Sequence, residues 1–310
     1  MSVFQDLYFD SSNAGNKIHV LKCIPDGNPK AVVQIAHGIS EHIDRYREFM
    51  SFLADNGFLA VGNDHLGHGQ NIALGGEKGF FAEENGWNYV VSDMDKLHDL
   101  VREDYPDIPY VFFGHSMGSF LTRTYLIDHP DKYDAAIISG TGHQSPLMVI
   151  GGYLMAEMAV KKEGAHATGY RLNDVAFGSY NKGFPNPRTK FDWLSRDEAI
   201  VDKYMADPLC GFVATVSLFR DMMGGIRYIT DQKNISRMNK DKPIYFMSGA
   251  EDPVGENGKG VDRAYKAFCR AGLKDIFLRL YPEGRHEMLN ELNRSDVYRD
   301  IVNWLNEKIG

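Results

Sequence analysis

Long apolar runs, basic clusters and an even set of cysteines are all missing from this 310-residue sequence. No uninterrupted apolar stretch reaches the roughly 20 residues that a membrane-spanning helix needs. Residues 1–6 lack the basic and apolar regions that begin a secretory signal peptide. We therefore expect neither a transmembrane segment nor a signal peptide, and at most transient contact with a membrane or micelle.

Positive charge is also scarce. Lysine and arginine together number 34 against 42 acidic residues, which gives a formal net charge of −8. This balance argues against a nucleic-acid partner, because nucleic-acid-binding surfaces are basic. The three cysteines, at positions 23, 210 and 269, are odd in number and widely separated. Free thiols in a reducing cytoplasm are the simplest interpretation.

What the chain does contain is an alternation of strand-like and helix-like segments. Segments 6–10 and 17–24 flank a turn at Asn13-Ala-Gly-Asn16 and predict a β-hairpin. Further strand-like runs occur at 31–36, 58–62, 110–113, 135–139, 243–247 and 276–281, and helical patterns at 45–56, 88–104 and 117–127. This order predicts an α/β fold with a mostly parallel, doubly wound sheet.

The alternation is interrupted between residues 139 and 243. This gap is far longer than an ordinary connection, and it contains helix-like pieces near 147–161, 195–206 and 215–228. We therefore predict a core in two parts, 1–143 and 238–310, with a mainly helical cap inserted at 144–237. Hydrophobic residues make up 43% of the chain, which is ample for one large core plus such an insertion.

Gly114-His-Ser-Met-Gly118 is the most informative motif. It follows the strand-like run 110–113 and precedes a helical pattern, which is the context of a nucleophile elbow. Such a turn exposes the hydroxyl of its serine, here Ser116, and the flanking glycines let strand and helix approach closely. The sequence thus predicts Ser116 as a catalytic nucleophile.

A serine nucleophile needs a base, and the base needs an acid that orients it. Asp252 follows the predicted strand 243–247, and His286 follows the predicted strand 276–281. The order Ser, Asp, His and the position of each residue just after a strand predict a triad at one edge of the sheet. Glu251, the neighbour of Asp252, is an alternative acid.

An oxyanion hole requires two backbone N–H donors aimed at the charge that develops during acyl transfer. The residue after the nucleophile, Met117, is one expected donor. The second is expected from the loop after the strand-like run 31–36, where Gly38 gives the backbone freedom and Ile39 supplies the N–H group. We also expect His37 and Gly38 to contact substrate.

Five motifs occur in an order that resembles a known family. They are His37-Gly-Ile-Ser-Glu-His42, Asp64-His-Leu-Gly-His-Gly69, Gly114-His-Ser-Met-Gly118, Leu194-Ser-Arg-Asp197 with Asp207-Pro-Leu209, and Gly284-Arg-His-Glu287. Together they resemble the monoglyceride lipase and lysophospholipase branch of the α/β-hydrolases, which is related to the serine aminopeptidases. The resemblance implies the α/β-hydrolase fold, the triad Ser116, Asp252 and His286, and oxyanion donors at Ile39 and Met117.

The predicted cap is rich in methionine, whose flexible side chain suits an irregular apolar surface. We expect Met155, Met158 and Met222 to line a tunnel for an acyl chain, although each could simply pack the cap onto the core. Asp64 with His65 and His68 could be read as a metal site. A serine triad needs no metal, and the glycines of this segment indicate a tight loop, so we expect no metal and no cofactor.

Three functions stay open at this level. The leading one is a serine carboxylester hydrolase acting on monoacylglycerols, lysophospholipids or similar small lipid esters through an acyl-enzyme. An aminopeptidase or amidase on the same scaffold is the second, with Glu157, Glu163 or Asp174 holding an amino group. The third is a binding protein without turnover. In each case we expect a monomer or homodimer.

Overall fold

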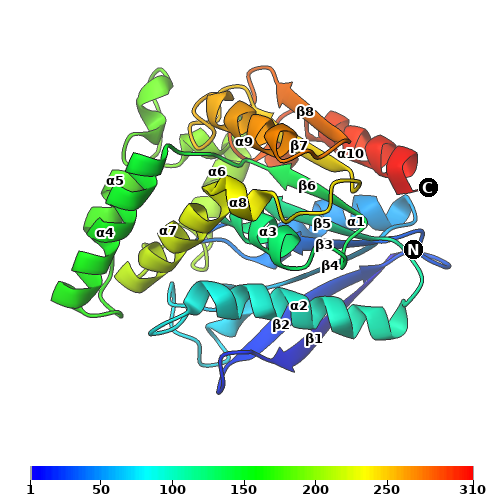
Figure 1. Cartoon of the computed structure of the whole chain (residues 1–310), viewed down its shortest axis with the longest axis horizontal. Helices are drawn as coiled ribbons and strands as arrows, with labels where there is room; N and C mark the ends of the chain where they lie inside the picture. Colours follow the sequence, from blue (N-terminus) through cyan, green and yellow to red (C-terminus); the bar gives the residue numbers. More distant parts are fainter. Residues whose placement is uncertain (1, 310) are drawn as a thin grey trace.

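The computed structural model describes residues 2–309 and contains one eight-stranded sheet in the order β1-β2-β4-β3-β5-β6-β7-β8 (Figure 1). Strands β1 and β2 and strands β2 and β4 pair antiparallel, and all the other neighbours pair parallel. The strands are β1 (Val3–Asp10), β2 (Lys17–Ile24), β3 (Val32–Ala36), β4 (Leu59–Asn63), β5 (Tyr110–His115), β6 (Ala135–Ser139), β7 (Ile244–Gly249) and β8 (Ile276–Tyr281). The predicted mostly parallel sheet is confirmed.

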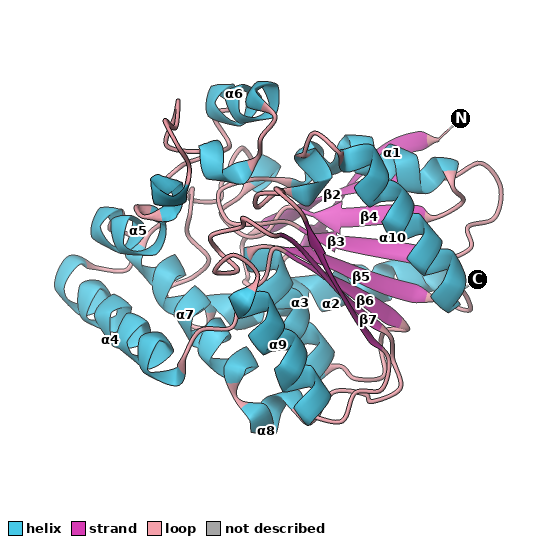
Figure 2. Cartoon of the chain, turned by 90° about the horizontal axis from the view of Figure 1, so that it is seen from above, coloured by secondary structure: helices cyan, strands magenta, loops and turns pink. Residues whose placement is uncertain are grey.

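Helices cover both faces of this sheet (Figure 2). The α-helices are α1 (Arg47–Asp55), α2 (Gly86–Asp104), α3 (Met117–Asp128), α4 (Pro146–Glu163), α5 (Tyr170–Phe177), α6 (Glu198–Ala206), α7 (Val216–Thr230), α8 (Gln232–Ile235), α9 (Lys259–Arg270) and α10 (Arg294–Ile309). Short 3₁₀ helices are η1 (Ile43–Tyr46), η2 (Gly69–Asn71), η3 (Tyr180–Gly183), η4 (Asp192–Leu194) and η5 (Met288–Asn290). Within residues 2–309, no helix has the length and apolar character needed to cross a bilayer.

The central strands are buried on both faces, which explains why they read as continuous apolar runs. Every residue of β3 to β7 is buried. Helices α1 and α10 pack on one face, and α2, α3 and α9 pack on the other. Two-sided coverage of this kind is what a parallel sheet requires, because crossover helices return on its faces.

Helices α4 to α8 all lie between β6 and β7, within the segment where the sequence predicts an insertion. We call this segment, residues 144–237, the helical insertion. Its helix α7 packs against α2 and α3 of the core and against α4, while α4 lies farthest from the sheet (Figure 1). The insertion therefore rests on the core mainly through α7.

Several elements differ from the sequence-based prediction. Strand β1 begins at Val3, because it pairs with β2 along its whole length. Helices α5, α9 and α10 were not predicted, although α9 and α10 carry a helical signal. In α10, Val297, Ile301 and Leu305 repeat every four residues and are all buried. The spacing places them on one helix face, so periodicity alone could have identified this helix.

A charged clamp joins the helical insertion to the loop before α2. His166 lies with Nδ1 2.6 Å from Glu77 and Nε2 2.6 Å from Glu83, and its ring stacks on Phe80 at 4.3 Å. Because both ring nitrogens face carboxylates, the geometry suits the imidazolium form, in which both nitrogens donate. The hydrogen bonds to Glu77 and Glu83 raise the pKa of His166.

The His166 clamp should make stability depend on pH. A raised folded-state pKa means that the contribution is fully present below the unfolded pKa, near 6.5, and is lost as pH rises through the folded value. His166→Gln should therefore lower the melting temperature at pH 5.5 more than at pH 9. The clamp is exposed, so we expect no more than about 1 kcal/mol. An equal loss at both pH values would contradict this assignment.

Candidate active site

Ser116 occupies a sharp turn between β5 and α3, with φ 53° and ψ −121°. A positive φ is costly for a residue with a Cβ atom, and such strain is typical of functional turns. The motif glycines allow the turn. A Cβ atom on Gly118 would overlap the carbonyl oxygen of Ala36. The backbone N–H of Ser116 donates to the carbonyl of Ser139 at 3.0 Å, which ties the turn to the end of β6.

Asp252 and His286 meet at the same edge of the sheet, just after β7 and β8. Nδ1 of His286 lies 3.0 Å from each carboxylate oxygen of Asp252. The carboxylate also accepts hydrogen bonds from Ser248 Oγ and the Val254 N–H, each at 2.9 Å. Both side chains are almost completely buried. These contacts hold the imidazole in one orientation.

The electrostatics of this pair favour the charged forms of both partners. Burial lowers the pKa of His286, but the charge and hydrogen bond of Asp252 outweigh burial and raise it above its ordinary value. Burial raises the pKa of Asp252. The charge of His286 and the hydrogen bonds from His286, Ser248 and Val254 outweigh burial and lower that pKa overall. Asp252 is thus suited to stabilise an imidazolium on His286.

Glu251, the alternative acid, lies elsewhere. Its side chain is exposed and lines a separate surface cavity, while its backbone N–H donates to Gly284 at 2.9 Å. The structure therefore brings Asp252, and not Glu251, to His286.

Ser116 and His286 line one cavity of about 230 Å³ together with Gly38 and Ile39. Rings flank His286 on two sides: the centroid of His115 lies at 4.6 Å and that of Trp193 at 5.1 Å. Burial, followed by the nearby charge of His286, lowers the pKa of His115 to about 4. His115 is therefore neutral at pH 7 and leaves His286 as the group that can take a proton there.

The predicted oxyanion donors lie beside the serine. A Cβ atom on Gly38 would be 3.1 Å from Cβ of Ser116, so this turn passes directly over Ser116. Across residues 2–309, neither the N–H of Ile39 nor that of Met117 donates to a protein acceptor. Met117 is also the first residue of α3, where the helix dipole favours negative charge. Both groups are thus suited to bind an oxyanion.

His37 differs from its expected role. It is fully buried and does not line the cavity. Its Nδ1 donates to the carbonyl of Gly38 at 2.7 Å, and its Nε2 accepts the N–H of His65 at 3.0 Å. Burial, together with the neighbouring His68, holds the pKa of His37 well below its ordinary value. A neutral His37 therefore supports the turn through its hydrogen bonds. Of the two residues, Gly38 lines the cavity and His37 does not.

A buried charge network, which sequence reasoning missed, supports both loops. Glu41 accepts the N–H of Gly38 at 2.5 Å and the hydroxyl of Tyr46 at 2.9 Å. Arg45 pairs with Glu41 at 2.5 Å and with Glu287 through two bonds of 2.7 Å. Burial opposes ionisation of Glu287, but Arg45 lowers its pKa to about 2. The network links the turn that carries Gly38 and Ile39, which we call the oxyanion turn, to Glu287, the residue after His286. Glu41 and Glu287 each belong to a sequence motif, and this was the signal that could have identified the network.

Replacing Arg45 with methionine should leave the two buried carboxylates of Glu41 and Glu287 without their cationic partner. We expect a loss of about 3–5 kcal/mol in the free energy of unfolding, measured by urea denaturation, and slower ester hydrolysis. Arg47→Met is the matched control, because Arg47 is 42% exposed and its ion pair, with Asp44, lies at the surface. The control should cost less than about 1 kcal/mol. Equal losses in the two variants would show that the buried network does not contribute specifically to the free energy of unfolding.

In the segment with Asp64, His65 and His68, the Asp64 carboxylate forms hydrogen bonds that hold neighbouring segments together. The Asp64 carboxylate accepts the N–H of Ile43 at 2.9 Å and of Gln70 at 2.8 Å, and lies 2.8 Å from Nδ1 of His19. Burial with the neighbouring His37 lowers the pKa of His65, and burial lowers that of His68 to about 4. The carboxylate is therefore committed to joining three segments of the core.

The cavity walls come largely from the helical insertion, but not from the expected methionines. Met158 is 64% exposed on α4, Met222 is buried in the packing of α7, and none of Met155, Met158 and Met222 lines the cavity. The apolar lining from the helical insertion includes Phe177, Phe191, Trp193, Leu194, Phe212 and Val213. Polar residues of the helical insertion in this lining include Asn173, Asp174, Asn181 and Lys190. Methionine content identified an apolar insertion but could not identify which of its faces meets the core.

Comparison with known proteins gives a family match and several related proteins. A family model described as "Serine aminopeptidase, S33" matches residues 27–293. The monoacylglycerol lipase of Mycolicibacterium smegmatis is 27% identical over 91% of this chain and 90% of that protein. The human monoglyceride lipase is 25% identical over 92% of this chain and 85% of that protein. A thermostable carboxyl esterase from Bacillus coagulans superposes with a TM-score of 0.93 at 27% identity, covering 99% of each chain.

Proposed function

Since the chain belongs to this serine aminopeptidase family of α/β-hydrolases, we propose that it hydrolyses single-chain lipid esters such as monoacylglycerols and lysophospholipids. The chain is a carboxylester hydrolase of the monoglyceride lipase type. The observation that carries the substrate proposal is the cavity, in which Ser116 and His286 meet an apolar wall of aromatic and aliphatic side chains. An acyl chain suits such a wall, and a polar head group suits its few polar residues.

In the proposed reaction, Ser116 Oγ attacks the ester carbonyl while His286 Nε2 takes its proton. Asp252 stabilises the resulting imidazolium through Nδ1. The N–H groups of Ile39 and Met117 bind the oxyanion. His286 then gives its proton to the leaving alcohol, and an acyl-enzyme on Ser116 remains. Water attacks the acyl-enzyme with His286 again as the base. His286 then returns the proton to Ser116 Oγ as the acyl–oxygen bond breaks, and the fatty acid leaves.

The helical insertion supports the proposed role of a cap over the site. Its residues Phe177, Trp193 and Phe212 form the cavity wall that faces the catalytic loops. The backbone N–H of His286 also donates to the carbonyl of Trp193 at 3.3 Å, so the insertion contacts the catalytic loop directly. We assign acyl-chain recognition to this surface. The three free cysteines support a cytoplasmic location.

Chain-length dependence tests the substrate class. Each methylene buried contributes about 0.8 kcal/mol, so kcat/KM should rise severalfold per added carbon pair from acetyl to octanoyl esters. Phe212→Ser should flatten this rise. Met158→Ser is the matched control and should leave it unchanged, because Met158 lies outside the cavity. A flat profile in the parent, or equal effects of the two variants, would refute an acyl site here.

The peptidase alternative is not favoured by the site. Of the acidic residues considered for holding an amino group, only Asp174 lines the cavity, whereas Glu157 accepts a hydrogen bond from Tyr153 along α4. Aminoacyl amides should consequently be turned over much more slowly than monoesters. Multiple turnover of any ester also separates an enzyme from a binding protein.

A further inference from the structure

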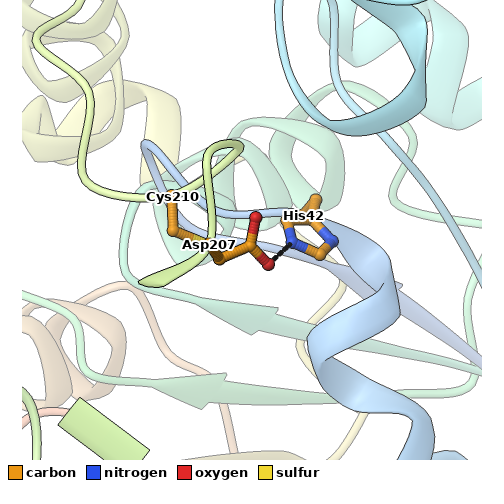
Figure 3. Close-up of side chains that lie close together, drawn as sticks. All are labelled: His42, Asp207 and Cys210. Atoms are coloured by element: carbon orange, nitrogen blue, oxygen red, sulfur yellow. Dashed lines mark hydrogen bonds and ion pairs between the residues drawn. The ribbon is translucent and has the colours of Figure 1, made fainter. Parts of the chain in front are cut away.

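Three potential metal ligands from two distant segments meet beside the oxyanion turn (Figure 3). His42 lies just after the turn, at the start of η1, while Asp207 and Cys210 lie in the turn that follows α6. One ligand atom of each residue lies within 4.8 Å of the others. Figure 3 shows His42 approaching from one ribbon and the other two residues from the facing turn. The cluster therefore spans the junction between the core and the helical insertion.

The turn that carries two of these residues is well ordered by its own hydrogen bonds. Oδ1 of Asp207 accepts the N–H of Leu209 at 2.8 Å, and the N–H of Cys210 donates to the carbonyl of Asp207 at 3.0 Å. Oδ2 of Asp207 is left to face His42 Nε2 at 2.9 Å. The next residue, Gly211, donates its N–H to Ser40 at 2.9 Å. The backbone thus holds the side chains in place before any ligand binds.

We propose that His42, Asp207 and Cys210 bind a divalent cation of the zinc type, with water completing a tetrahedral shell. Imidazole, carboxylate and thiolate are the three ligand classes that Zn²⁺ takes in proteins. Tetrahedral Zn²⁺ with these ligands needs separations of about 3.4–3.6 Å between ligand atoms. The ligand atoms of His42 and Asp207, 2.9 Å apart, must separate by roughly half an ångström, and Cys210, within 4.8 Å of both, must approach by at most about 1.4 Å.

Burial and charge both suit a cation at this position. The His42 side chain is 8% exposed and Cys210 is 9% exposed, while Asp207 is 31% exposed and gives a path from solvent. The carboxylates of Asp207, Glu41 and Glu287 and the guanidinium of Arg45 all act electrostatically on Cys210. The local balance is negative, and Arg45 is already paired. Binding converts the Cys210 thiol to a thiolate and releases one proton to solvent.

A second group of potential ligands in the described chain serves as a contrast. Asp95, His98 and Asp99 also gather their ligand atoms within 4.8 Å. Lys132 already lies among them, with Nζ 2.8 Å from Asp95 and 2.9 Å from Asp99. An internal cation therefore satisfies that group. Among residues 2–309, no lysine or arginine forms an ion pair with Asp207, whose side chain faces the imidazole of His42 instead.

A bound cation would join the helical insertion to the segment that carries the oxyanion donor Ile39. It would not touch the reacting atoms, because none of its three ligands lines the catalytic cavity. The site is thus an added, metal-dependent cross-link between core and insertion. It is independent of the triad chemistry, which needs no metal.

Cobalt(II) tests the site directly, since Co²⁺ replaces Zn²⁺ and gives a thiolate-to-metal absorption band in the near ultraviolet. One equivalent of Co²⁺ added to the EDTA-treated protein should produce this band, and Zn²⁺ should abolish it. Zn²⁺ should also raise the melting temperature in a saturable manner. Cys210→Ser should remove the band. Cys210→Ser and Asp207→Asn should each weaken Zn²⁺ binding at least about tenfold.

Cys269→Ser is the matched control, because Cys269 is an exposed thiol far along the chain from the cluster. It should keep both the band and the Zn²⁺ stabilisation. Circular dichroism of each metal-free variant establishes that it is folded. A band that survives in Cys210→Ser, a band lost in Cys269→Ser, or no band in the parent would each overturn the proposal. In the last case, the cluster is a hydrogen-bonded contact between core and insertion only.

Discussion

Ser116→Ala is expected to lower ester hydrolysis by about 10⁴-fold or more while leaving the melting temperature nearly unchanged. The hydroxyl is the only group that the substitution removes, and the half-exposed Ser116 side chain contributes little to packing. The remaining rate would come from the oxyanion donors and from substrate binding. Initial rates with p-nitrophenyl esters measure the effect, and a thermal melt establishes that the variant is folded.

A fluorophosphonate probe gives a second measurement of the same nucleophile. The parent should take up one equivalent, at Ser116, and Ser116→Ala should take up none. Ser119→Ala is the matched control, because Ser119 lies three residues away with its hydroxyl donating to the carbonyl of Ser116 at 2.6 Å. The control should still be labelled. Labelling at another residue, or hydrolysis retained by Ser116→Ala, would refute the assignment.

Asp252→Asn is expected to reduce kcat by about 10⁴-fold, because the neutral amide neither orients His286 correctly nor stabilises its imidazolium. The pH dependence should change as well. Asp252 raises the pKa of His286, so its neutralisation should lower that pKa and move the acid limb of kcat/KM to lower pH. A purely structural defect would reduce the rate without this shift.

Glu251→Gln is the matched control for the acid. Glu251 is adjacent in sequence but exposed, and its carboxylate makes no contact with His286 in the described structure. The rate should change less than about threefold, as is usual for a surface substitution away from the chemistry. If the control were the inactive variant and Asp252→Asn retained activity, the acid would have to be reassigned to Glu251.

The sheet was predictable because its central strands are buried on both faces. Their residues are nearly all apolar over five or six positions, and such runs are visible without knowing what covers them. The insertion was predictable in position, since it interrupts the alternation of strands and helices. Its internal packing was not, because α4 is apolar on nearly all sides and its exposed face includes Leu147 and Met158.

The residues of the candidate site also fall into those that local sequence identifies and those that it does not. Ser116 was identifiable because a strained turn between strand and helix demands glycine at 114 and 118, and that demand is local. The choice between Asp252 and Glu251 was not local. Both follow β7 directly, and only the position of the loop after β8 decides which carboxylate meets His286.

Local sequence patterns predict the order of the strands, the serine of the elbow and the residue types of its proposed partners, because each pattern involves residues close together in the chain. The folded chain is needed to see the cavity wall, the Glu41–Arg45–Glu287 network and the meeting of His42 with Asp207 and Cys210. These features join segments that are far apart in the sequence. Their distances depend on how helices pack on the sheet, and no local pattern of residue types encodes that packing.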